Sequence, residues 1–153
     1  MKAAVASIPS SAKDFQIGNL LYCITEKGVK VGEISQISKT TIGHIIYVLI
    51  DGCEFGGLFE SLCTEPIPIT EEFLVKNGFK HLYDELCEYN FYIRRIGECQ
   101  VDIQLENSNR GGDYVVCHID NSDMCTIASA DIKYVHQLQN LLNLVNISGE
   151  FEA

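Results

Sequence analysis

The chain has 153 residues, of which 46% are hydrophobic and 21% are charged, and its formal net charge is −10. A chain of this length can bury a core without disulfides or metals, and its negative charge repels phosphate backbones, which disfavours general DNA or RNA binding. No apolar run reaches the roughly 18 residues that a membrane-spanning helix requires, so no membrane association is expected.

The first part of the sequence predicts a small all-β subdomain. Residues 1–14 form a small-residue segment without the apolar stretch of a secretory signal, and we expect a flexible leader there. Short strand-like runs then follow one another, separated by TEKG, SKTTIG and glycine-rich turns. This rhythm predicts a small antiparallel, SH3-like β-barrel over residues 15–67. Its aromatic residues are expected in the core or in a groove: Tyr22, Tyr47, Phe55 and Phe59.

A short linking helix is expected after this subdomain, within a second part that covers residues 68–153. Pro66 and Pro68 favour an extended connector. Thr70 is a suitable N-cap, and Asn77-Gly78 is a suitable helix end. The segment KHLYDELCEY that follows is compatible with either a helix or an extended chain.

The remaining sequence predicts an α+β arrangement, packed with the linking helix as one unit. The runs NFYIRRI, ECQVDIQLE, DYVVCHID and DMCTIAS predict a four-stranded antiparallel meander, with NSNRGG as a hairpin tip. The last segment, IKYVHQLQNLLNLVNISGEF, reads as one long amphipathic helix that covers the meander. Its apolar stripe is spaced as a helix requires: Tyr134, Leu138, Leu141, Leu142 and Val145.

The polar side of this predicted helix supplies the best binding candidates. His136, Asn140 and Asn143 share one helical face and can contact a ligand or a partner. The alternative is that His136 is a boundary residue and that the neighbouring amides, Gln137 and Gln139 among them, tie the helix to nearby strands and loops.

Three arginines are the candidate anion ligands. Arg94 and Arg95 are adjacent on a predicted strand, so only one of them can face a given groove and clamp a phosphate or carboxylate. Arg110 lies in the predicted hairpin tip and can close over a ligand. The alternatives are an exposed edge-strand charge and a solvated loop.

Seven cysteines occur at irregular spacing, without a C-x-x-C pair. An odd, irregular set is not typical of a disulfide framework or a zinc site, so we expect reduced thiols in a cytoplasm, no metal and no cofactor.

Three segments resemble a family of small proteins from phages and prophages of Bacteroidetes. PIPITEEFLVKNGF is similar to the family's PIPLTEEWLLKFGF, and YVHQLQNLLNLVNISGEF is similar to its ending YVHQLQNLYFALTGEEL. IGNLLYCITEKGVKVGEIS is similar to its opening segment. The sequence departs from the family in the last turn, where Leu142-Asn143-Leu144 replaces Tyr-Phe-Ala. The resemblance implies a phage origin and an order of elements, but no mechanism.

No catalytic motif is assembled by the sequence, so a non-enzymatic binding protein in the bacterial host cytoplasm is the leading hypothesis. One version is an anti-defence protein that sequesters a nucleotide signal or blocks a host protein. In that version an arginine binds phosphate, while His136 and Asn140 contact a base. The alternatives are a virion structural, assembly or adaptor protein, with a possible homo-oligomer, and a small nucleotide hydrolase.

Overall fold

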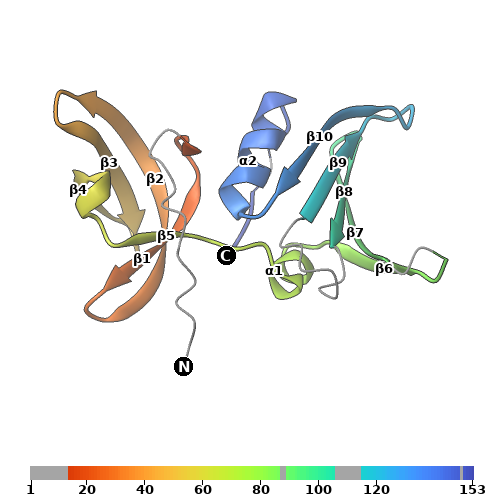
Figure 1. Cartoon of the computed structure of the whole chain (residues 1–153), viewed down its shortest axis with the longest axis horizontal. Coiled ribbons are helices and arrows are strands. Elements are labelled where there is room, and N and C mark those ends of the chain that lie inside the picture. Colours follow the sequence, from red (N-terminus) through yellow and green to blue (C-terminus); the bar gives the residue numbers. More distant parts are fainter. Residues whose placement is uncertain (1–13, 87–88, 106–114, 149) are drawn as a thin grey trace. The chain divides into compact units, whose positions relative to one another are not determined.

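The computed structural model describes residues 14–86, 89–105, 115–148 and 150–153. The chain divides into two compact units, Met1–Pro66 and Ile67–Ala153. Each unit holds one five-stranded antiparallel sheet (Figure 1). Apart from Asp14, the predicted leader lies outside the described residues.

The first unit is a meander of four strands with a fifth strand added beside the first. The strands are β1 (Leu20–Thr25), β2 (Gly28–Thr40), β3 (Gly43–Ile50), β4 (Cys53–Leu58) and β5 (Thr64–Pro66), with a 3-10 turn, η2 (Phe59–Ser61), before β5. Their order in the sheet is β4-β3-β2-β1-β5.

Two hairpin turns of this unit, TEKG and TTIG, are built in the same way. The hydroxyl of Thr25 donates to the carbonyl of Gly28 at 2.8 Å, and the hydroxyl of Thr40 donates to the carbonyl of Gly43 at 2.7 Å. Both glycines have positive φ, +110° and +137°, which side chains disfavour. The sequence T-x-x-G therefore fixes both turns locally.

The first sheet is open, so the predicted SH3-like barrel over residues 15–67 is wrong. β4 pairs with β3 and β5 pairs with β1, and each forms an edge of the sheet. β5 has three residues, and its Pro66 has no N–H to donate to a further strand. The concave interior is closed by side chains instead: Phe15, Leu21, Cys23, Ile34, Ile46 and Val48 are buried, and Ile37, Ile50, Phe59 and Leu62 pack against them.

The second unit contains five strands and two short helices. They are α1 (Glu71–Lys76), β6 (Lys80–Asp84), β7 (Tyr89–Ile96), β8 (Cys99–Leu105), β9 (Val115–Asp120), β10 (Thr126–Ile132) and α2 (Val135–Leu144), with the sheet order β10-β9-β8-β7-β6. The segment that the sequence left open, KHLYDELCEY, begins as strand β6. The meander therefore has five strands instead of the predicted four, and the predicted tip NSNRGG falls on residues outside those described.

The linking helix forms where the sequence predicts it. The Thr70 hydroxyl accepts a hydrogen bond from the Phe73 N–H at 3.1 Å, and Phe73 and Leu74 are buried. Gly78 follows the helix with φ +78°. The connector before the helix is extended, as the two prolines predict. The carbonyl of Ile67 in this connector accepts a hydrogen bond from the N–H of Val135 at 2.8 Å.

The predicted long C-terminal helix is wrong, and so is the α+β class, since the described residues are mostly strand. α2 has ten residues and ends at Leu144. Asn146 adopts a left-handed conformation, φ +57°, and the N–H of Ile147 donates to the carbonyl of Leu142 at 3.0 Å. This is a Schellman ending, in which asparagine replaces the usual glycine. Asn146 therefore ends the helix inside the segment that the sequence predicts as one helix.

Candidate functional site

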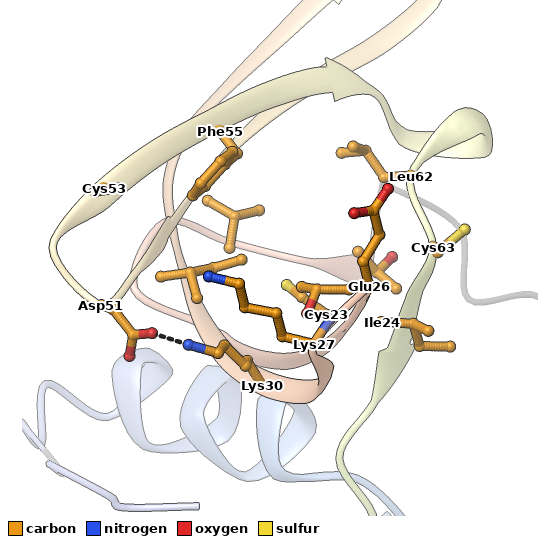
Figure 2. Close-up of a pocket in the computed structure, with 14 residues that line it drawn as sticks. Cys23, Ile24, Glu26, Lys27, Lys30, Asp51, Cys53, Phe55, Leu62 and Cys63 are labelled. Carbon is orange, nitrogen blue, oxygen red and sulfur yellow. Dashed lines mark hydrogen bonds and ion pairs between the residues drawn. The ribbon is translucent and has the colours of Figure 1, made fainter.

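The open sheet of the first unit holds a pocket of about 500 Å³. Three segments surround it (Figure 2): the β1–β2 turn, the β3–β4 turn with the start of β4, and the chain from Leu62 to Thr64. The volume lies within the range of roughly 300–1,000 Å³ typical of small-molecule sites. The pocket therefore has room for a small organic molecule.

The floor of the pocket depends on a glycine in β2. Cys23 and Val48 line the floor and are 6% and 2% exposed. A Cβ at Gly32 would lie 2.3 Å from Cγ1 of Val48 and 2.9 Å from Sγ of Cys23. The missing side chain at Gly32 thus lets β1 and β3 side chains meet over β2.

Apolar side chains form most of the wall. Phe55, on the edge strand β4, is 56% exposed, and Ile24, at the end of β1, is 49% exposed. Ile50 and Leu62 complete the apolar lining. Large exposed apolar groups around a hollow favour a ligand with an apolar body.

Four charged residues also line the pocket, and two of them neutralise each other. Lys30 on β2 forms an ion pair and hydrogen bond with Asp51 in the β3–β4 turn (Figure 2). Asp51 and Gly52 both have positive φ, +50° and +77°, which is the conformation of a two-residue hairpin turn. The other two, Glu26 and Lys27, lie in the β1–β2 turn.

The thiol on the floor is not set up for nucleophilic chemistry. Burial raises the pKa of the Cys23 thiol above its ordinary value. The thiolate, not the thiol, is the nucleophile, so Cys23 stays protonated and inert near neutral pH. This favours binding over covalent catalysis in the pocket.

The second unit carries the residues predicted as a site, and His136, which the sequence places on the polar side of the last helix, is buried. His136 is 2% exposed, and its ring stacks on Tyr134 with the centroids 5.8 Å apart. The buried surface of α2 is wider than its apolar stripe and includes His136. Asn140 is half-buried and Asn143 is exposed, so the three residues on this face of α2 differ in their access to a ligand.

The neighbouring amide Gln137 has the structural role that was considered as the alternative. Its Oε1 accepts hydrogen bonds from the N–H groups of Lys133 and Tyr134, at 2.7 and 3.1 Å. This caps the start of α2, where backbone N–H groups otherwise lack acceptors.

Arg94 and Arg95 lie on opposite faces of β7, as their adjacent positions predict. The guanidinium carbon of Arg94 lies 5.7 Å from the ring centroid of Phe151, within cation–π range. Arg95 is exposed on the other face of β7. Arg110 lies outside the described residues. Arg94 therefore serves packing in the second unit.

Three polar side chains of the second unit form a row, in register on three neighbouring strands of its sheet. Asp102 on β8 pairs with His118 on β9, which pairs with Ser129 on β10. The Ser129 hydroxyl and Nδ1 of His118 are 2.9 Å apart. Among the described residues, however, no donor reaches the buried Oδ1 of Asp102, so the carboxylate does not orient the imidazole as a nucleophile–base pair requires.

The electrostatics of this row follow from burial. Burial raises the pKa of Asp102, His118 opposes that shift, and Asp120 adds to it. Neither here nor elsewhere in the described part of the chain is a cluster of three or more His, Cys, Asp or Glu side chains placed to hold a metal ion.

Comparison with known proteins gives no relative: no family model, no curated protein and no solved structure matches the chain. Of the helices that the structure describes, none has the length and apolar character needed to cross a bilayer.

The pocket was missed by sequence reasoning because its lining comes from separate segments. The one signal was the group of aromatic residues in the first subdomain, for which a groove was the alternative to the core. Phe55 lines the pocket, whereas Phe59 packs on Phe15 with ring centroids 5.7 Å apart.

Proposed function

We propose that this chain is a non-enzymatic binding protein that takes up a small, largely apolar molecule in the pocket of the first unit. The observation that carries the proposal is the hollow of about 500 Å³, walled by exposed Phe55 and Ile24 and floored by a protonated thiol. Burying the apolar part of a ligand there supplies the driving force for binding.

The apolar lining also bears on the class of ligand. A nucleotide needs polar partners for its sugar and phosphates, and most of the groups that line this pocket are carbon. In the setting that the phage resemblance implies, the protein would sequester an amphipathic small molecule in the cytoplasm of a bacterial host. A nucleotide signal is the competing ligand, and calorimetric titration with cyclic dinucleotides separates the two.

Fluorescence titration with N-phenyl-1-naphthylamine, a neutral apolar probe, tests the proposal. Binding should be saturable and should weaken about fivefold to tenfold in Phe55→Ser, because part of an apolar contact of roughly 1 kcal/mol or more is lost. Ile42→Ser is the matched control, since Ile42 is 74% exposed in the same unit and does not line the pocket.

Amide chemical shifts recorded during the same titration locate the probe. They should change at residues of the pocket lining, such as Val48 and Ile50. Absence of saturable binding, or shift changes confined to the second unit, would overturn the proposal.

A further inference from the structure

We propose that Lys27 binds the head group of the ligand, so that the pocket prefers apolar molecules that carry a single negative charge. This inference rests on the proposed function, because it assigns the polar end of a ligand whose apolar body occupies the same pocket.

The argument begins with the charges that remain available at the pocket. Lys30 is engaged by Asp51. Lys27 forms no ion pair with any residue that the structure describes. Figure 2 shows its side chain extending over the pocket on the side of Asp51 and Phe55, while the carboxylate of Glu26 points to the other side, near Leu62. The available cation thus lies over the hollow.

The turn that contains Lys27 fixes the position of its backbone. The backbone N–H of Lys27 donates to the Thr25 hydroxyl at 3.2 Å, and that hydroxyl donates to the Gly28 carbonyl at 2.8 Å. The base of the side chain is therefore held by the T-x-x-G turn, while the four-carbon stem remains free to adjust the ammonium to a bound anion.

The net charge of the protein does not cancel this preference. Charges farther than about 8–10 Å are largely screened at physiological salt, so the overall charge of −10 acts weakly at the pocket. Among the charges that line the pocket, the Lys30–Asp51 pair is neutral as a unit, and the Glu26 carboxylate points to the other side, near Leu62, so that Lys27 is the nearest unpaired charge on the side of Phe55. A carboxylate attached to an apolar chain would meet the ammonium of Lys27 while its chain lies against Phe55.

Three ligands that each contain eight carbons and differ in their head groups test the inference: octanoate, octanamide and octylammonium. We expect the wild-type protein to bind octanoate about threefold to fivefold more tightly than octanamide, as suits an exposed ion pair, and octylammonium most weakly. The octanoate preference should shrink when the sodium chloride concentration rises from 50 to 500 mM, whereas octanamide binding should not weaken.

Lys27→Gln should remove the preference for octanoate and leave octanamide affinity unchanged, and Lys27→Glu should shift the preference to octylammonium. Lys39→Gln, which removes a lysine of β2 outside the pocket lining, is the matched control and should behave as the wild type. Equal binding of octanoate and octanamide by the wild type, or a preference that survives Lys27→Gln, would overturn the role of Lys27 alone. Failure of all three ligands to bind would overturn the proposed function itself.

Discussion

The side-chain amide of Asn77 is hydrogen-bonded in both directions to the backbone of Glu152. Its Nδ2 donates to the Glu152 carbonyl at 2.6 Å, and its Oδ1 accepts from the Glu152 N–H at 2.7 Å. Nδ2 also donates to the Phe73 carbonyl at 2.9 Å. Asn77 thus joins the end of α1 to the last residues of the chain, where Phe151 packs against Phe73 and Phe79.

Replacing Asn77 should destabilise the protein. Asn77 is 8% exposed, so Asn77→Ala would leave backbone groups of Glu152 without partners and should cost about 2–4 kcal/mol of unfolding free energy, measured by urea denaturation. Asn77→Asp keeps the acceptor but places a carboxylate oxygen against the carbonyls of Phe73 and Glu152, so it should destabilise at least as much as Asn77→Ala. An unchanged unfolding free energy in either variant would contradict the two-way contact.

Gly32→Ala should strain the floor of the pocket. The added Cβ would sit 2.3 Å from Cγ1 of Val48, so neighbouring strands must shift, and we expect a loss of about 1–3 kcal/mol. Val48→Ala removes the opposing atom. In a double-mutant cycle the two substitutions should together cost less than the sum of their separate effects. Strict additivity would mean that the side chains do not meet.

His136→Ala should destabilise the protein. The imidazole is 2% exposed and stacks on Tyr134, so its removal leaves a cavity and should cost about 1–3 kcal/mol in thermal or urea unfolding. Asn143→Ala, at an exposed position of the same helix, should change the unfolding free energy by less than about 0.5 kcal/mol. Equal effects of the two substitutions would argue against a buried His136.

Asp102→Asn should change how stability depends on pH. The pKa of Asp102 is raised, with burial as the main cause, so its carboxyl favours folding below the unfolded-state pKa of about 3.9, and this contribution is lost as the pH rises through the folded-state pKa. The variant should therefore gain stability relative to the wild type as the pH rises above about 4, in urea denaturation across a pH series. Asp131→Asn, at an exposed position of β10, is the control. A difference that does not vary with pH would contradict the prediction.

Local signals in the sequence predicted local structure well. The T-E-K-G turn, the Thr70 cap and the alternation of β8, in which Val101 and Ile103 are fully buried, each depend on residues close together in the chain. The extended connector through the two prolines has the same origin. Such features need no knowledge of distant partners.

Features that depend on distant partners were not predictable. Ile147 and Phe151 lie beyond the end of α2, and both are 9% exposed, while Asn77 holds the backbone of the neighbouring Glu152. The apolar stripe ends at Val145, and the predicted helix wrongly extends past Asn146, whose left-handed conformation depends on a backbone contact with Leu142. Whether the first sheet closes into a barrel, and whether it holds a pocket, likewise depends on which strands pair. The burial of His136 also depends on residues outside its own face of the helix.

The short strand β5 gives the pocket a particular vulnerability. Each hairpin of the first unit closes between neighbours in sequence, whereas β5 must return to β1, so that Leu21 pairs with Pro66. Loop closure over so many residues is entropically costly, and three residues offer few hydrogen bonds in return. Because Cys63 and Thr64 supply one wall, the cavity exists only while this strand is docked. An occupant that contacts that wall would consequently slow hydrogen exchange along the β1–β5 ladder, and the empty protein would fray there first.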